Sequence, residues 1–316
     1  MNLTTERFPF PYPIHAVTFA PFVRKGVIFS EEAKESLLAL RERTGANSVI
    51  IVPAGLQDTA QSETIQFAEG ELMGDEELIS MIDFAHEKGL AVFLKPTVNC
   101  KNGTWRAHIN FFDEDVPCEP KWGNWFKSYS AFQCHYARIA EKNGCEMFIA
   151  GCEMVMSERR EKEWRATISD IREHYTGPVS YNTDKYQEHN VKWWDAVDII
   201  SSSGYYPRGD WENQLDRIEK VVKKFNKPFF FAETGCMSTH GSSAVPNDWS
   251  VKGDIDNEEQ AAWYEEMLSA VSGRSWVGGT AIWSWAPSLS RDFTGGKGYE
   301  IYGKPSEAIV KQYYSG

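Results

Sequence analysis

Two glutamates of the sequence follow apolar segments of the kind that form buried strands. Glu153 lies in the segment FIAGCEM, and Glu233 lies in PFFFAETG. A carboxylate at such a position is costly unless it is paired or functional. Two carboxylates that face each other can hydrolyse a glycosidic bond, because one protonates the leaving oxygen while the other attacks the anomeric carbon. A glutamate at the end of each of two predicted strands therefore indicates glycoside hydrolysis.

The charge of one glutamate would determine which of the two acts as the acid and which as the nucleophile. An ionised Glu233 favours the protonated form of a nearby Glu153, which then acts as the acid. Once Glu233 carries a sugar its charge is lost, so Glu153 releases its proton more easily and activates water. The alternative is that either glutamate is a salt-bridged carboxylate at a strand end, with Lys95 as one possible partner.

The elements that must position these residues alternate along the chain. Apolar segments predict eight buried parallel strands, at residues 15–20, 48–53, 91–97, 147–153, 178–182, 199–205, 228–233 and 279–285. Helical patterns lie between and after them, at residues 30–44, 75–88, 122–143, 158–175, 213–225, 257–272 and 304–314. The expected N-caps are Ser30, Asp75 and Asn257. The fifth crossover, 183–197, is short and irregular.

This order predicts an α/β protein with a single-domain (β/α)8 TIM barrel over residues 1–316. The alternative is a doubly wound open sheet, which normally carries a glycine-rich phosphate loop after an early strand. The sequence contains no GxGxxG and no GxxxxGK[ST] motif. We therefore favour the barrel.

Three long connections follow the carboxyl ends of predicted strands, at residues 54–74, 98–121 and 234–256. In a barrel this face carries the active site. The last two connections contain rings suited to the walls of a sugar-binding cleft, namely Trp105, His108, Phe111, Phe112, His240 and Trp249. Three polar residues at strand ends are expected to bond sugar hydroxyls: Lys95, Asn99 and Asn182.

The segments GCEM, FAETG and AIWSW resemble a known group of enzymes. It is clan A of the glycoside hydrolases, (β/α)8 barrels with catalytic glutamates on strands four and seven, and within it the family 113 endo-β-1,4-mannanases. The resemblance covers about residues 10–314. It implies double displacement with retention, Glu153 as acid/base and Glu233 as nucleophile.

The expected substrates are mannan, glucomannan and manno-oligosaccharides, cut at β-mannosidic bonds without a cofactor. Two alternatives stay open. One is another clan A β-glycosidase, acting on β-glucan or β-1,3-mannan. The other is a non-catalytic barrel that only binds carbohydrate.

The resemblance also suggests roles for aromatic residues. Tyr205 would bond the nucleophile, with Tyr206 as the alternative because the strand register is uncertain by one residue. Trp283 would form the platform beneath the sugar, and Trp285 is the alternative because it lies two residues further along the same strand.

Cys152 departs from the pattern of the clan, many of whose members have Asn immediately before the acid/base. That Asn bonds the sugar 2-hydroxyl, whereas a thiol is a weak partner. The 2-hydroxyl of mannose is axial and points elsewhere, so the departure favours mannan over glucan or xylan.

Composition restricts the partners. Lys plus Arg number 33 and Asp plus Glu number 45, so the net charge is −12, which argues against binding along nucleic-acid backbones.

No apolar run reaches the roughly 20 residues of a membrane span. Residues 1–13 lack the pattern of a signal peptide, which favours a cytoplasmic location; the alternative is a secreted protein from which a signal peptide was removed. The charged run 157–163 predicts the solvated start of a helix.

The cysteines and histidines show no metal-binding spacing. Six cysteines occur without a CxxC pair, and seven histidines occur without HxH or HExxH. We expect free thiols and no metal site.

Overall fold

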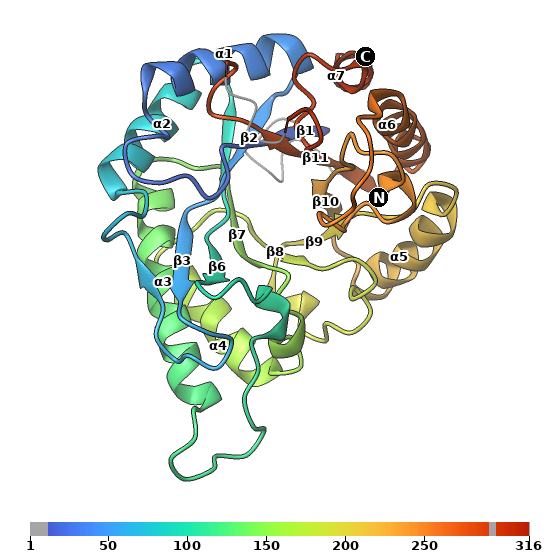
Figure 1. The fold of residues 1–316 in the computed structure, drawn as a ribbon. Helices are drawn as coiled ribbons and strands as arrows, with labels where there is room; N and C mark the ends of the chain where they lie inside the picture. The colour runs from blue at the N-terminus through green and yellow to red at the C-terminus, as the bar shows by residue number, and fades with distance from the viewer. Residues whose placement is uncertain (1–11, 291–294, 316) are drawn as a thin grey trace.

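A computed structural model describes residues 12–290 and 295–315. Eight parallel strands close into a barrel in the order β1-β11-β10-β9-β8-β7-β5-β2 (Figure 1). Their bounds are Ile14–Phe19 (β1), Ser48–Ile51 (β2), Ala91–Leu94 (β5), Met147–Cys152 (β7), Val179–Thr183 (β8), Ile199–Gly204 (β9), Phe229–Thr234 (β10) and Val277–Trp285 (β11). The predicted (β/α)8 barrel is confirmed, and the open-sheet alternative is wrong.

Helices surround the barrel in the described ranges (Figure 1). They are Glu31–Thr44 (α1), Asp75–Glu87 (α2), Trp122–Lys142 (α3), Glu161–Arg172 (α4), Trp211–Phe225 (α5), Asn257–Ser272 (α6) and Pro305–Tyr314 (α7). The crossover from β8 to β9 contains only the short 3-10 helix Trp194–Ala196 (η3), as its irregular sequence predicts.

One of the three expected N-caps is confirmed. The Ser30 hydroxyl accepts a hydrogen bond from the amide of Ala33 at 3.1 Å. The other two predictions were wrong by one residue, because α2 is capped by Gly74 and α6 by Asp256. The Asp256 carboxylate accepts from the amide of Glu259 and so satisfies a free N–H of the first turn.

The barrel interior is packed with apolar side chains, which is why the site sits at its mouth. They are Ile14, Ala16, Ile50, Val52, Ala91, Phe93, Met147, Ile149, Ile199, Phe230, Ala232 and Ala281. A larger apolar cluster fills the space between strands and helices.

A small second sheet lies almost entirely where the sequence predicted loops. Its order is β4-β3-β6, with bounds Ala54–Gln57 (β3), Gln66–Phe67 (β4) and Thr97–Cys100 (β6). Pro53 and Pro96 follow the barrel strands β2 and β5, and neither has an N–H to continue the ladder. Pairing resumes beyond them between β3 and β6. The predicted strand 91–97 is therefore divided.

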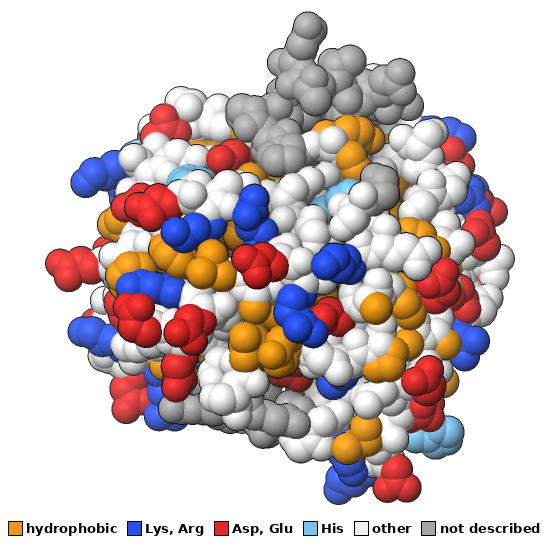
Figure 2. Space-filling model, turned by 90° about the horizontal axis from the view of Figure 1, so that it is seen from above, with side chains coloured by type: hydrophobic (Ala, Val, Ile, Leu, Met, Phe, Trp, Pro, Cys, Tyr) orange, Lys and Arg blue, Asp and Glu red, His pale blue; other side chains and the backbone are white. Residues whose placement is uncertain are grey.

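The surface mixes charges of both signs. Figure 2 shows acidic and basic side chains interspersed over one face, with apolar side chains between them. No helix within the described ranges is long and apolar enough to cross a membrane. All six cysteines are free thiols, as expected. The N-terminal segment, where no signal peptide is predicted, lies largely outside the described residues.

Candidate active site

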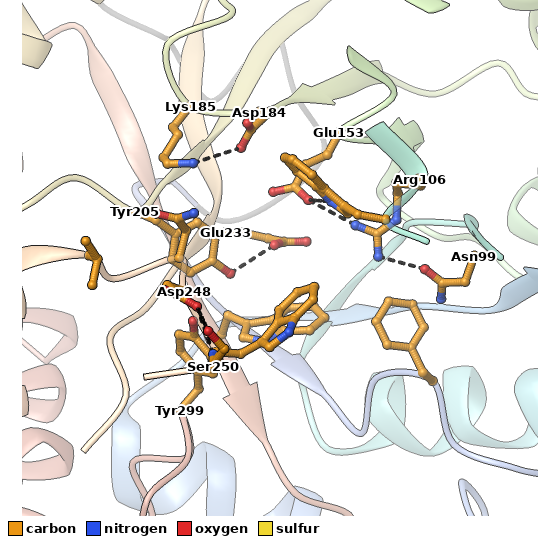
Figure 3. Close-up of a pocket in the computed structure, with 16 residues that line it drawn as sticks. Asn99, Arg106, Glu153, Asp184, Lys185, Tyr205, Glu233, Asp248, Ser250 and Tyr299 are labelled. Carbon is orange, nitrogen blue, oxygen red and sulfur yellow. Dashed lines mark hydrogen bonds and ion pairs between the residues drawn. The ribbon is translucent and has the colours of Figure 1, made fainter. Parts of the chain in front are cut away.

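A cleft of about 860 Å³ opens at the carboxyl ends of the barrel strands (Figure 3). Its walls are Phe22, Asn99, Trp105, Arg106, Glu153, Asp184, Lys185, Tyr205, Glu233, Val245, Asn247, Asp248, Trp249, Ser250, Trp283 and Tyr299. An adjoining cavity of about 440 Å³ shares Trp249, Trp283 and Tyr299 with it. The cleft therefore continues past these aromatic residues.

A shift in strand pairing turns Glu233 into the cleft. Ala232 faces the barrel interior, so regular alternation would turn Glu233 outward. The pairing of β10 with β9 shifts between Phe231 and Glu233. Such an irregularity exchanges the faces of a strand and re-aims the side chains that follow.

β7 has a similar shift before Glu153. Its pairing with β8 shifts between Ile149 and Cys152, and Gly151 between them has φ +101°. The shift brings the Cys152 thiol to the interior, where regular alternation from Ile149 would have turned it outward. Glu153 has φ +52°, in the left-handed region. Glu153 consequently lines the cleft, and the buried Cys152 thiol lies against Glu233.

Three donors surround the carboxylate of Glu233. The Lys95 ammonium lies 2.5 Å from Oε1, the Cys152 thiol donates to the same oxygen at 3.2 Å, and the Tyr205 phenol donates to Oε2 at 3.0 Å. Burial opposes the charged form, but Lys95 outweighs it with the help of Arg106 and Cys152, so the pKa of Glu233 lies below its ordinary value. Glu233 is thus an ionised, oriented carboxylate.

Lys95 and Asn182 lie beneath the cleft rather than on its wall. Both side chains are completely buried, and the Lys95 ammonium donates to Oδ1 of Asn182 at 3.3 Å. The amide of Asn182 in turn donates to the hydroxyl of Ser203 at 3.1 Å. In this structure the two residues organise the glutamates, and direct bonding of sugar by either one stays a prediction.

Both carboxylate oxygens of Glu153 accept hydrogen bonds. The Ser203 hydroxyl donates to Oε1 at 2.8 Å, while Arg106 and the indole of Trp105 donate to Oε2 at 3.0 and 3.2 Å. Arg106 also donates to Oδ1 of Asn99, which lines the cleft (Figure 3). Bonding of sugar by Asn99 stays a prediction. Sequence reasoning missed Arg106 and Ser203. The one available signal for Arg106 was its position beside Trp105 in a long loop.

The structure separates the two alternatives for the tyrosine. Tyr205 lines the cleft and reaches Glu233, whereas the phenol of Tyr206 donates to Glu188 in the core at 2.6 Å. Burial, followed by the charge of Glu233, raises the pKa of Tyr205 well above its ordinary value, so the phenol stays a neutral donor.

The two tryptophans of the last strand do not face the same way. Trp283 lines the cleft, while Trp285 is completely buried and its indole donates to the Ser36 hydroxyl at 3.0 Å. The pairing of β11 with β1 shifts between Val17 and Phe19, so the expectation that both rings share one face was wrong.

The aromatic residues of the long loops lie in three kinds of place: the cleft, the core and the exposed surface. Trp105 and Trp249 line the cleft, but Phe111 packs edge-on against Trp122 instead. His240 pairs with Asp256 at 3.0 Å. His108 and Phe112 are absent from the walls described above.

Asp184 and Lys185 form a part of the cleft wall that sequence reasoning missed. Lys185 Nζ lies 3.8 Å from Oδ1 of Asp184 (Figure 3). Burial, followed by the charge of Glu153, raises the pKa of Asp184 to about 8. A neutral carboxyl at this position can donate a hydrogen bond to a sugar.

The separation of the two carboxylates limits the chemistry. One oxygen of Glu153, one oxygen of Glu233 and the sulfur of Cys152 all lie within 4.8 Å of one another. Retaining glycosidases place their carboxyl groups about 5–5.5 Å apart, whereas inverting enzymes need about 6.5–9.5 Å to admit a water. The geometry fits direct attack on the sugar.

Comparison with known proteins identifies the family. The model of Glycoside Hydrolase Family 113 matches residues 17–304, which is most of the sequence. The chain belongs to glycoside hydrolase family 113.

Solved structures agree with membership of family 113. One described as a complex of a family 113 β-1,4-mannanase is 54% identical, with a TM-score of 0.93 over 96% of this chain and 98% of the other. The β-mannanase of Alicyclobacillus acidocaldarius in complex with ManMIm is 40% identical, with a TM-score of 0.91 over 96% and 97%. A Ruminococcus gnavus β-glucuronidase is 14% identical and shares the fold alone, with a TM-score of 0.65 over 96% and 50%. No protein of curated function matches the sequence.

Two groups of three possible metal ligands occur in the described part of this family 113 barrel. They are Cys152 with Glu153 and Glu233, and His240 with Asp256 and Glu259. In both groups the carboxylate oxygens already accept hydrogen bonds from protein donors. The absence of a metal and of a cofactor stays a prediction.

Proposed function

We propose that the chain is a retaining endo-β-1,4-mannanase that cuts within mannan, glucomannan or manno-oligosaccharides. The assignment of the substrate rests on the 54% identity, over nearly the whole chain, with a structure described as a β-1,4-mannanase. The continuation of the cleft into the adjoining cavity supports binding of several sugars. The close pair of carboxylates supports retention.

In the first step Glu233 is the nucleophile. Its carboxylate forms a bond with the anomeric carbon while the bond from that carbon to the bridging oxygen breaks. Glu153 gives its proton to that oxygen, which leaves as a hydroxyl of the released fragment. Tyr205 and Lys95 orient the attacking carboxylate beforehand, so little reorganisation is needed.

In the second step Glu153 is the base. It takes a proton from water, the water oxygen bonds to the anomeric carbon, and the ester bond to Glu233 breaks. The second inversion restores the original configuration. Arg106 and Ser203 stabilise the carboxylate of Glu153 in this step.

Arg106 alters the division of labour expected from the sequence. That expectation treated the charge of Glu233 as the main influence on Glu153. The guanidinium of Arg106 donates to Oε2 of Glu153 at 3.0 Å, so a positive charge that the expectation left out lies beside this carboxyl group. Lys95 likewise offsets the charge of Glu233.

The test is hydrolysis of β-1,4-mannohexaose beside cellohexaose and xylohexaose, with product sizing and NMR of the first anomer released. We expect manno-oligosaccharides from the first substrate only, with the β-anomer appearing first. Release of mannose alone contradicts the endo mode, and an α-anomer contradicts retention. Cleavage of the gluco- or xylo-substrate in place of mannohexaose contradicts the choice of mannan.

A further inference from the structure

A chain of buried hydrogen bonds lies behind Glu153 and joins the turn after β7 to β8, its neighbour in the barrel (Figure 1). The backbone amide of Met154 donates to the phenol oxygen of Tyr181 at 3.1 Å. The phenol donates to Oε1 of Glu158 at 2.7 Å, and the Thr183 hydroxyl donates to the same oxygen at 2.6 Å. Each bond of this chain is within the normal range.

The turn that carries Glu153 needs such support. A non-glycine residue at φ +52° is strained and keeps that conformation only where its surroundings impose it. The amide of Glu153 donates to the carbonyl of Asn182 at 2.8 Å, so β8 fixes this residue first. The next amide, of the buried Met154, has the phenol of Tyr181 as its acceptor. A buried N–H without an acceptor is costly, so losing the phenol would favour rearrangement of the turn.

Glu158 anchors this arrangement. The charged run 157–163 predicted that Glu158 lies at the solvated start of a helix. The side chain of Glu158 is instead buried, and α4 begins only at Glu161. The indole of Trp193 donates to the Glu158 carbonyl at 3.0 Å, which fixes its backbone. Glu158 is not among the cleft-lining residues. Any influence on the reaction therefore passes through the groups it touches.

We propose that Tyr181 and Glu158 are positioning residues that hold Glu153 in the orientation for proton transfer; this inference rests on the proposed function. Tyr181 fixes the amide that follows Glu153. Glu158 accepts the hydrogen bond that the phenol donates, which leaves a lone pair of the phenol oxygen to accept from the amide of Met154. Glu233 is oriented by other contacts, so loss of the phenol affects the acid/base and leaves the nucleophile in place.

The test uses Tyr181→Phe and two substrates that differ in their need for an acid. The kcat/KM on β-1,4-mannohexaose should fall about 10- to 100-fold, because a misplaced acid transfers its proton poorly. The kcat/KM on 2,4-dinitrophenyl β-mannobioside should stay within about threefold, because that leaving group departs without a proton. Azide should accelerate turnover of the second substrate by the variant, since it attacks the glycosyl-enzyme without needing a base.

The matched control is Tyr175→Phe. The Tyr175 phenol is also buried and donates to the carbonyl of Cys145, before β7 begins, at 2.7 Å. This variant should lose stability but keep the wild-type ratio of kcat/KM between the two substrates. Equal losses of Tyr181→Phe on both substrates would overturn the inference.

A second pair of variants tests the proposal if Tyr181→Phe does not fold. Glu158→Ala should then show the same loss on mannohexaose alone, and Glu158→Gln should restore most of it, because the amide oxygen still accepts from Tyr181 and Thr183. An unchanged ratio in Glu158→Ala overturns the positioning role. Failure of the wild type to cleave either substrate overturns the proposed function and this inference with it.

Discussion

The ammonium of Lys95 lies 2.5 Å from Oε1 of Glu233 and is completely buried. A buried lysine is rare unless it is paired, and a buried carboxylate stays charged only beside a strong partner. Each group therefore makes the burial of the other possible. The pair explains how a carboxylate beneath a sugar remains ionised without water around it.

Replacement of Lys95 by Met should lower kcat/KM on mannohexaose about 100-fold at neutral pH, because the nucleophile loses its charge partner and its orientation. With Lys95 present, the pKa of Glu233 lies below its ordinary value, so the carboxylate stays ionised as the pH falls. Without Lys95 burial dominates and raises that pKa. The acid limb of the kcat/KM profile should consequently move to higher pH.

The control is Lys227→Met, whose ammonium donates to the carbonyl of Val197 away from the cleft. Its acid limb should match that of the wild type. Breaking a buried pair typically costs about 3–5 kcal/mol of unfolding free energy, so thermal unfolding must first establish that Lys95→Met is folded. An unmoved acid limb in the folded variant contradicts this role of Lys95.

Glu233→Ala should lower kcat on mannohexaose about 10,000-fold or more, because the covalent step is lost. Azide should restore turnover of 2,4-dinitrophenyl β-mannobioside and give an α-mannosyl azide, since the anion enters on the face that Glu233 vacates. Glu307→Gln, a change at a buried carboxylate of α7, should keep activity. A β-azide from Glu233→Ala would show that the nucleophile lies elsewhere.

The two tryptophans of β11 should respond differently to replacement by Ala. Trp283→Ala removes a wall of the cleft, so kcat/KM on mannohexaose should fall about 100-fold while the melting temperature changes little. Trp285→Ala leaves a core cavity and should lower the unfolding free energy by about 3–5 kcal/mol. Kinetics on folded protein and calorimetry separate the two. Similar effects of both variants on kcat/KM would argue against the assigned faces.

Cys152→Asn should raise the ratio of glucan to mannan hydrolysis about tenfold, the worth of one added hydrogen bond to an equatorial 2-hydroxyl. Cys152→Ser, which keeps a small donor toward Glu233, serves as the control and should leave the ratio near that of the wild type. Initial rates on cellohexaose and mannohexaose give the ratio. If it does not change in Cys152→Asn, this residue does not set the sugar preference.

His240 should make the stability of the cleft loop depend on pH. Its hydrogen bond to Asp256, followed by the charge of Glu259, raises the pKa of His240 in the folded state. The stabilisation is then fully present below the ordinary pKa of about 6.5 and is lost as pH rises through the folded value. The melting-temperature difference between wild type and His240→Gln should shrink from pH 5.5 to 8.5. A constant difference contradicts the linkage.

Several features followed from local sequence because they depend on local physics. Apolar segments of strand length predicted the barrel strands, and Ser30 predicted the start of α1. Glu153 and Glu233 were found because each follows such a segment, and parallel strands of a barrel end on one face. The division of the third strand was missed although Pro96 marks the point where its ladder stops.

The side chains that complete the site could not be found in this way. Arg106 meets Glu153 across 47 residues of sequence, and its loop has no periodic pattern to predict the contact. Glu158 lies in a charged run typical of an exposed helix, yet hydrogen bonds from β8 account for its burial. A residue's partners across such distances are fixed only when the strands have assembled.

The sequence by itself determined that eight strands alternate with helices and that two carboxylates end two of them, because burial of apolar segments depends on residue type and spacing. Only the tertiary structure decided which way the critical side chains face. One-residue shifts between paired strands turned Cys152 and Glu233 inward and Trp285 outward. The physical reason is that a strand's two faces are exchanged by its register against a neighbour, and that register is a property of the assembled barrel.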